Sequence, residues 1–276
     1  MVDPINTAPQ SRPPRDDAWT VAAIAVLAYV VANVAHETIG HGAGLLLAGG
    51  RSGIFTTTRL IVPTPVPAPA WRIFDLGGPA GNLIFGGLGW LGVRTFSTTR
   101  TRWRLFSWLV MAFSLFWGFG YMLFSGVMGR GDWLALLPEN QAPGRVLLAI
   151  AGLVFYFASM RLAAHELGRI LTGPAEEVRI RARRLAGIAW LAGGVIATAG
   201  AALDPRGPLE IINSGAMSSF GLAVGLLRVP RRIKSVPAAV HFPGDVITRS
   251  TSWVAAALAV SLFFIALLGR GIPWRL

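Results

Sequence analysis

The sequence predicts an all-α protein, a polytopic helical membrane protein with about seven transmembrane helices and a short extended segment after the first of them. Composition is the first observation behind this prediction: 53% of the 276 residues are hydrophobic and only 14% are charged, with a mean hydropathy of +0.56. The second is that runs of about 20 mostly apolar residues, the length that crosses a bilayer, recur along the chain.

The apolar runs define the predicted organisation of the chain. They leave little room for a soluble domain. Two of them, the second and the sixth, are rich in glycine and interrupted by polar residues. We expect the spans at residues 19–48, 76–96, 104–129, 145–163, 184–203, 208–228 and 252–270. The predicted parts are a disordered, proline-rich tail at 1–18, a three-helix membrane core at 19–137, and additional transmembrane helices of unknown role at 138–276.

The stretch after the first apolar run differs from its surroundings. Residues 51–62, "RSGIFTTTRLIV", contain the Ile, Phe, Thr and Val that favour extended structure. The prolines of "PTPVPAPA" (63–70) exclude the interior of a helix. Together the two stretches predict a loop at the membrane surface that contains a short hairpin.

Charge and cysteine content exclude several classes of protein. The net charge is +12, but the arginines fall mainly between apolar segments, where membrane topology and lipid head groups account for them. The expected partner is therefore the lipid bilayer and not nucleic acid. The chain has no cysteine, so any transition metal must be held by imidazole and carboxylate groups. The expected location is a bacterial cell membrane, as a multi-pass integral protein.

A cluster of ionisable residues lies inside the first apolar run. "NVAHETIGHGAG" (33–44) places His36, Glu37 and His41 at membrane depth, where charged groups are costly and mark functional sites. The stretch is one residue longer than a His-Glu-x-x-His zinc helix. In a regular α-helix, residues four apart differ by about 40° around the axis and residues five apart by about 140°.

Two arrangements of this cluster can bind a metal ion. One π-type turn absorbs the additional residue and returns both histidines to one face of the helix, and Gly40 eases that distortion. Alternatively, the helix stays regular and Glu37 and His41, four residues apart, are the ligands. Only the first arrangement leaves Glu37 free to act as a base.

The cluster resembles two families of zinc peptidases. The pattern His-Glu-x-x-x-His, with Gly before the second His, is similar to the zinc helix of the dipeptidyl peptidase III family, where this spacing still gives two histidine ligands and a glutamate base. In its membrane context, "HETIGHGAGLLLAGG" (36–50) resembles the zinc helix of the site-2 protease family of intramembrane metalloproteases.

The resemblance to site-2 proteases covers about residues 25–137. "GGPAGNLIFGG" (77–87) looks like the Gly-Pro-x-x-Asn element of that family, and the matching asparagine is Asn82. "LFSGVMGRGDWLALL" (123–137) is similar in placement to the third core helix, whose aspartate corresponds to Asp132. The family has Leu-Asp-Gly or Asn-Pro-Asp-Gly around this aspartate, whereas this chain has Gly-Arg-Gly-Asp-Trp.

The resemblance implies a catalytic site. Zn²⁺ would be held by His36, His41 and Asp132, with Glu37 as the general base and Asn82 binding the oxyanion or the substrate strand. The activity implied is an endopeptidase that cleaves transmembrane or membrane-adjacent segments of membrane proteins, so its partner would be a substrate helix. Because odd and even spans run antiparallel, these side chains should lie on the same side of the membrane.

Other interpretations stay open at this point. Asp75 is an alternative third ligand, and Glu166 at a helix end near arginines predicts an interfacial salt bridge. The alternative function is a non-catalytic membrane protein, an inactive protease homologue that uses the histidines for a structural metal or for a partner. An ion or proton transporter should show broken helices in two related halves, and the sequence shows no such symmetry. The side of the membrane that carries the site is also open.

Overall fold

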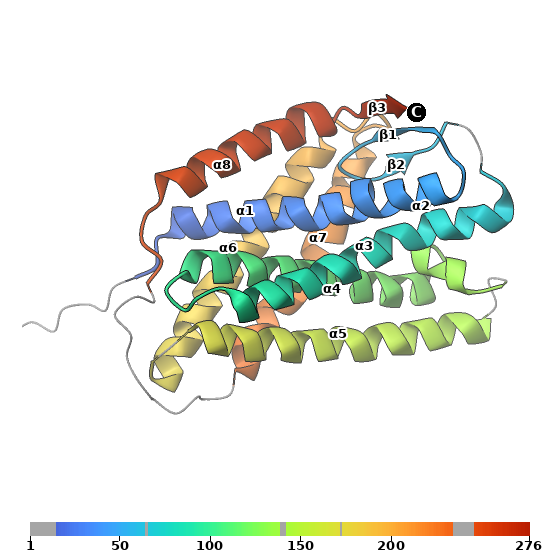
Figure 1. The fold of residues 1–276 in the computed structure, drawn as a ribbon. Helices are drawn as coiled ribbons and strands as arrows, with labels where there is room; N and C mark the ends of the chain where they lie inside the picture. Colours follow the sequence, from blue (N-terminus) through green and yellow to red (C-terminus); the bar gives the residue numbers. More distant parts are fainter. Residues whose placement is uncertain (1–14, 64–65, 139–141, 172, 234–245) are drawn as a thin grey trace, which may run out of the picture.

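The computed structural model describes residues 15–63, 66–138, 142–171, 173–233 and 246–276. Figure 1 shows long helices side by side, with a small sheet near one end of the bundle. In chain order the elements are α1 (Ala18–Val34), η1 (Ala35–Gly40), α2 (His41–Leu47), β1 (Ser52–Phe55), β2 (Leu60–Ile61), α3 (Ala68–Thr95), α4 (Thr101–Met128), η2 (Asp132–Leu136), α5 (Ala142–Ile170), α6 (Ala175–Ala201), η3 (Ile211–Ala216), α7 (Met217–Leu222), η4 (Ala223–Arg232), α8 (Thr251–Leu262), η5 (Phe263–Leu268) and β3 (Ile272–Arg275).

Five helical stretches among the described residues are long and apolar enough to cross a membrane. They support the predicted helical membrane protein, but they do not confirm about seven spans. The second predicted span corresponds to α3, which contains charged residues and Pro79. The sixth corresponds to the η3–α7–η4 stretch, which changes helix type twice. The five stretches are Ala18–Leu47, Thr101–Met128, Ala142–Ile170, Ala175–Ala201 and Thr251–Leu268.

The first helix continues through a change of helix type. Asp17 caps its start, because a side-chain oxygen of Asp17 accepts a hydrogen bond from the Thr20 amide at 2.8 Å. The helix passes from α1 into the π-helical η1 and on into α2 without a break. The predicted π turn is therefore confirmed, and it lies at the histidine cluster.

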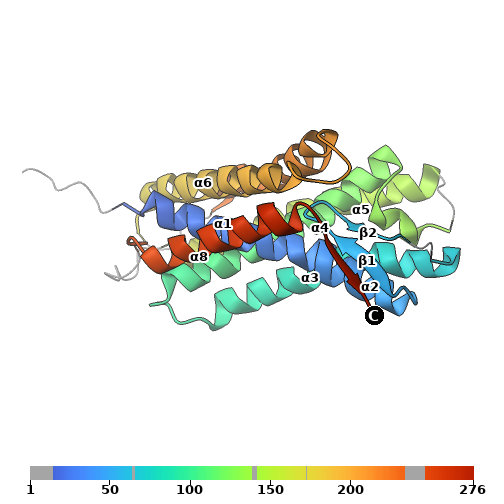
Figure 2. The ribbon, with the colours of Figure 1, turned by 90° about the horizontal axis from the view of Figure 1, so that it is seen from above.

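Helix α4 lies at the centre of the bundle, in contact with α1, α3 and α5 (Figures 1 and 2). Its large side chains Trp108, Phe113 and Phe116 are fully buried. Phe113 meets Tyr29 of α1 edge to face, with ring centroids 5.5 Å apart. The Trp108 indole donates to the Ala163 carbonyl of α5 at 2.8 Å. These contacts hold α1, α4 and α5 together and fix their positions relative to one another.

A buried ion pair joins α3 to α5, as predicted for Glu166. The Glu166 side chain is fully buried and accepts hydrogen bonds from Arg94 at 2.6 Å and from the Trp90 indole at 3.2 Å. Arg169 lies 3.6 Å from the same carboxylate. A buried charge is tolerated only when it is paired in this way.

The predicted hairpin is present, and it belongs to a larger sheet than predicted. β1 pairs antiparallel with β2, and β3 at the end of the described chain pairs antiparallel with the other edge of β1. The strand order β2-β1-β3 leaves β2 on an outer edge. The prediction of a loop through "PTPVPAPA" was wrong for its last residues, because α3 begins at Ala68. Pro69 fits there because the first helical turn needs no amide donor from it.

The segment before α1 is partly described. Residues 1–14 of the predicted tail lie outside the described residues. Asp16, which the sequence placed in that tail, is only 5% exposed. Its carboxylate accepts from Arg181 of α6 at 2.7 Å and from the Ile247 amide at 2.9 Å. These bonds fix the entry of α1 against α6 and the segment before α8.

Candidate metal centre

The π turn brings the two predicted histidine ligands to a common point. The ring centroids of His36 and His41 are 4.9 Å apart. Asp132 joins them, with its Oδ2 atom 3.1 Å from His36 Nε2 and 3.3 Å from His41 Nε2. One ligand atom from each residue lies within 4.8 Å of the other two. His36, His41 and Asp132 are therefore brought together as predicted, in a group that could hold a metal ion.

Close packing of α3 against η1 makes this geometry possible. A Cβ atom added at Gly40 would lie 2.4 Å from the Gly77 carbonyl oxygen, and one at Gly81 would lie 2.1 Å from the Ala35 carbonyl oxygen. Real Cβ atoms essentially never approach other atoms within 3.0 Å. The two backbones thus touch directly, and only glycine fits at these positions.

Gly78 of α3 lines the centre itself. A Cβ atom there would lie 2.5 Å from His41 Nε2 and 2.8 Å from His36 Nε2. The backbone of α3 therefore forms a wall of the space that both imidazole nitrogens face. Three aromatic side chains surround the imidazole rings, with ring centroids 4.9–6.1 Å from those of His36 or His41. They are Trp117, Tyr121 and Phe74.

The outer nitrogen of each imidazole has a partner that can fix its orientation. His41 Nδ1 lies 2.9 Å from the Phe74 carbonyl oxygen, which can only accept, so Nδ1 carries the proton. His36 Nδ1 lies 3.0 Å from the Asn82 amide nitrogen, while the Asn82 Oδ1 atom has no hydrogen-bond partner in the described part of the chain. If the amide group is flipped, Asn82 Oδ1 accepts a hydrogen bond from a protonated His36 Nδ1. Both Nε2 lone pairs then face the centre, as metal ligation requires.

Two glycines place Asp132 against the histidines. α4 ends at Met128, and Gly129 at its C-cap has a left-handed φ of 65°, while Gly131 has a φ of 114°. Both values are in the region that favours glycine. The Trp133 indole then donates to the Gly118 carbonyl at 2.9 Å and holds η2 on α4. The Gly-Arg-Gly-Asp-Trp sequence is therefore the turn that directs Asp132 inward.

The chemistry of the group suits a cation. With both Nδ1 atoms protonated, two imidazole lone pairs and a carboxylate oxygen converge, and all three are acceptors. Asp132 Oδ2 is buried and has no hydrogen-bond donor among the described residues. Buried acceptors without a donor are costly, and a metal ion among them removes that cost. Two histidines and a carboxylate are also the ligand types left to a chain without cysteine.

Glu37 lies beside the group without belonging to it. It is 8% exposed and interacts electrostatically with His36, His41 and Asp132. The three-residue group does not include it. Because the π turn is formed, the alternative arrangement on a regular helix, with Glu37 and His41 as ligands, is not the one adopted.

Asp75 is near the centre and is also outside the group. It lies eight residues into α3, next to Phe74. Burial raises the pKa of Asp75 to about 6, the charge of Asp132 adds to this effect, and His41 opposes it. The group of ligand atoms within 4.8 Å of one another includes Asp132 and not Asp75, which favours Asp132 as the third ligand.

The sequence analysis did not identify two residues near the candidate metal centre. Asn33, one helical turn before His36, donates from Nδ2 to the Thr57 carbonyl in the hairpin turn at 2.9 Å. Arg59 follows in the same turn and acts electrostatically on Glu37. Asn33 was visible as a polar residue within an apolar run, but its partner 24 residues away was not.

No family model, curated protein or solved structure matches this chain. The resemblance to site-2 proteases therefore stays a prediction, and any function assigned to the chain rests on the geometry of the centre.

Proposed function

We propose that the protein is a zinc-dependent intramembrane endopeptidase that cleaves transmembrane or membrane-adjacent segments of membrane proteins. One observation supports this most strongly. The π turn directs His36 and His41 to Asp132 and leaves Glu37 beside them, outside this group of candidate ligands. A site that served only to hold a metal would not need that fourth group.

The donor set favours zinc. Two imidazole nitrogens and one carboxylate oxygen are a set of three protein ligands, and catalytic zinc sites have three such ligands and an open position. When bound, the ion supplies a Lewis acid and lowers the pKa of water into the neutral range. His36, His41 and Asp132 would hold it.

The remaining chemistry belongs to side chains of the chain itself. Glu37 accepts a proton from the attacking water and delivers it to the leaving nitrogen, which is general base and then general acid catalysis. Asn82 holds the His36 ring in the orientation that ligation needs. The predicted role of Asn82 in binding the oxyanion stays a prediction.

The sheet offers a place for an extended substrate. Peptide bonds of a transmembrane helix are already hydrogen-bonded, so the helix must unwind before it is cleaved. The outer edge of β2, at Leu60–Ile61, carries no strand among the described residues. An unwound segment can add to such an edge through its backbone.

Metal content tests the binding half of this proposal. Purified protein should bind about one zinc ion per chain, and His36→Ala should lose it. His165→Ala is the matched control, since this histidine is exposed on α5, and it should bind zinc as the unaltered protein does. Equal zinc content in both variants would contradict the assignment of His36.

Cleavage tests the catalytic half. Membranes from cells that express the protein should gain new protein N-termini, identified by N-terminal labelling and mass spectrometry. Glu37→Gln should abolish them while retaining zinc, and Glu177→Gln, an exposed glutamate on α6, should not. Loss of zinc in Glu37→Gln would make Glu37 a ligand. If the unaltered protein binds zinc but produces no new N-termini, the non-catalytic alternative is favoured.

A further inference from the structure

The turn between β1 and β2 is fastened to the helix that carries the metal centre. Asn33 of α1 is 2% exposed, and its side chain donates to the Thr57 carbonyl at 2.9 Å. Asn33 precedes His36 by three residues, about 4.5 Å along the helix axis. It precedes Glu37 by four residues and thus lies on the same face of the helix. The turn is therefore held close to Glu37.

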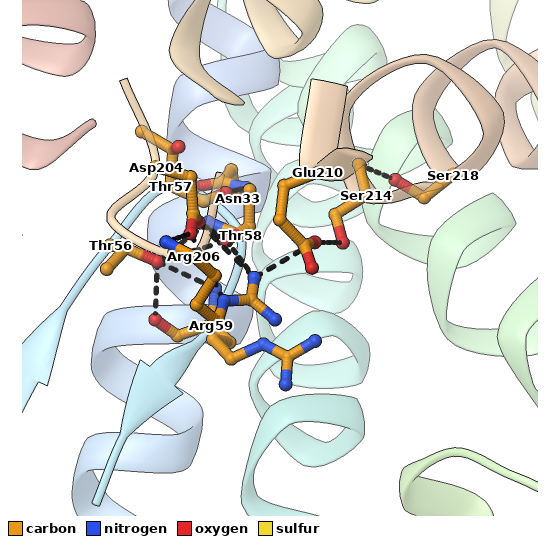
Figure 3. Close-up of polar contacts among 10 residues, drawn as sticks. All are labelled: Asn33, Thr56, Thr57, Thr58, Arg59, Asp204, Arg206, Glu210, Ser214 and Ser218. Carbon is orange, nitrogen blue, oxygen red and sulfur yellow. Dashed lines mark hydrogen bonds and ion pairs between the residues drawn. The ribbon is translucent and has the colours of Figure 1, made fainter. Parts of the chain in front are cut away.

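The second half of the chain holds the same turn from the other side (Figure 3). Thr58 donates to the carboxylate of Asp204, which lies just after α6. Arg206 donates to Thr58 Oγ1 at 2.8 Å and to Asp204 Oδ1 at 3.1 Å, and it pairs with Glu210 at 3.0 Å. Burial opposes ionisation of Asp204, yet these hydrogen bonds hold the pKa of its carboxyl below the usual value. The anchor is thus charged at neutral pH.

Hydrogen bonds within the turn fix the backbone of Arg59. The Thr56 hydroxyl donates to the Arg59 carbonyl at 2.8 Å and accepts from the Arg59 amide at 3.1 Å. The Thr56 amide also donates to the Arg59 carbonyl at 3.0 Å. The position of the Arg59 Cα atom is therefore set by three bonds within the turn and by the anchors on both sides.

The Arg59 side chain, in contrast, has no partner within the described part of the chain. Arg206 pairs with two carboxylates, whereas no ion pair or side-chain hydrogen bond among the described residues reaches the exposed Arg59 guanidinium. Figure 3 shows the Arg59 guanidinium pointing away from the bonded cluster, with no dashed line to it. It is near enough to act electrostatically on Glu37 and on Tyr121, which borders His36. A rigid turn thus presents an unpaired cation beside the metal centre.

We propose that Arg59 binds a carboxylate group of the substrate polypeptide next to the metal centre. This inference rests on the proposed peptidase function and adds its substrate preference. A guanidinium matches a carboxylate through two parallel hydrogen bonds. The guanidinium is exposed, so a carboxylate group of a bound polypeptide can reach it. The carboxylate comes from an acidic side chain near the scissile bond or from the C-terminus of the substrate.

Peptide binding to the metal-free protein tests this without any need for activity. The probes are fluorescent apolar decapeptides with a single Asp or Asn and an amidated C-terminus, and an all-apolar decapeptide with a free C-terminal carboxylate. EDTA-treated protein is used, so that a peptide carboxylate cannot bind a metal ion. The Asp peptide should bind about tenfold or more tightly than the Asn peptide, the effect of one charged hydrogen bond. A preference for the free C-terminus instead identifies the terminal carboxylate as the source.

Three variants assign this preference to one side chain. Arg59→Gln should remove it, and Arg59→Lys should restore part of it. Arg51→Gln alters an exposed arginine at the other end of the hairpin and should leave the preference unchanged. Melting curves by circular dichroism show that the variants are folded.

Several results would overturn the inference. One is equal affinity for the peptides with and without a carboxylate. Another is a loss of affinity in Arg59→Gln that is the same for both, which would indicate a structural role. A third is Arg59-dependent binding of anionic-lipid nanodiscs alone, which would assign the residue to the lipid surface. The proposed peptidase function fails separately if the protein does not bind zinc or does not cleave membrane proteins. In that case the metal-free protein would still prefer peptides with a carboxylate.

Discussion

Gly78 offers a direct perturbation of the metal centre, because a methyl group at this position enters the space between the ligands. In Gly78→Ala the new Cβ atom would lie 2.5 Å from His41 Nε2 and 2.8 Å from His36 Nε2, against an ordinary contact of 3.4–4 Å. An ordinary contact is restored only if the two nitrogens retreat by about 0.9 Å and 0.6 Å. Metal sites tolerate about 0.2 Å of error in ligand distance.

The expected result is a large loss of zinc affinity. Changes that only touch the partners of metal ligands reduce affinity by about 10–100-fold, and a displacement of both ligand atoms should reduce it by about 100-fold or more. Their Nδ1 contacts at Phe74 and Asn82 limit how far the rings can turn away. The crowding should also lower the free energy of unfolding by about 1–3 kcal/mol.

The assay is a competition titration of zinc against a chromophoric chelator in detergent, with helix content checked by circular dichroism. Gly87→Ala is the matched control, because it lies on the same helix and its Cβ would meet nothing within 4 Å. It should leave zinc affinity unchanged and stabilise the helix by about 0.5–1 kcal/mol. Unaltered zinc affinity in Gly78→Ala would refute the placement of the two imidazole nitrogens.

Three other parts of the structure give further predictions. Asn82→Leu removes the partner of His36 Nδ1 and should weaken zinc binding by about 10–100-fold in the same titration; unchanged affinity would show that the contact does not orient the ring. Gly131→Ala places a residue with a side chain at a positive φ, which costs about 1–3 kcal/mol. It should displace Asp132 and so reduce the zinc content. Full zinc content would mean that Asp132 is not a ligand. Glu166→Gln removes a buried charge that is distant in sequence from the candidate metal ligands. It should lower the free energy of unfolding, measured by chemical denaturation, by about 1–3 kcal/mol and leave the zinc stoichiometry unchanged. Loss of zinc would show that the Arg94–Glu166 ion pair affects the metal site.

Local sequence was enough to identify the widened turn as one of two possible arrangements of the helix that carries the histidines. His41 follows His36 by five positions, and an imidazole pair at this spacing shares one face only when a turn is widened. The resemblance to site-2 proteases added Asp132, which the structure places with both histidines. The sequence alone did not show that Asn82 contacts His36, since this depends on how closely α3 packs against η1.

The parts that were not predicted depend on contacts between distant residues. Thr58 bonds to Asp204, 146 residues further along the chain, and β1 pairs with β3 near the end of the chain. Neither partner carries a local signal that names the other. The second half of the chain, whose role was unknown, therefore completes the sheet and anchors the turn next to Glu37. Two of the seven spans predicted from hydropathy, at 76–96 and 208–228, are not among the five stretches of the described chain that are long and apolar enough to cross a membrane.

X-ray absorption at the zinc edge of the zinc-loaded protein identifies the side chains that hold the ion. One zinc site is expected, with two imidazole nitrogens and a carboxylate oxygen at about 2.0–2.2 Å, and one imidazole should be lost in His41→Ala. A spectrum with a single imidazole, or a protein that takes up no zinc, would contradict this assignment.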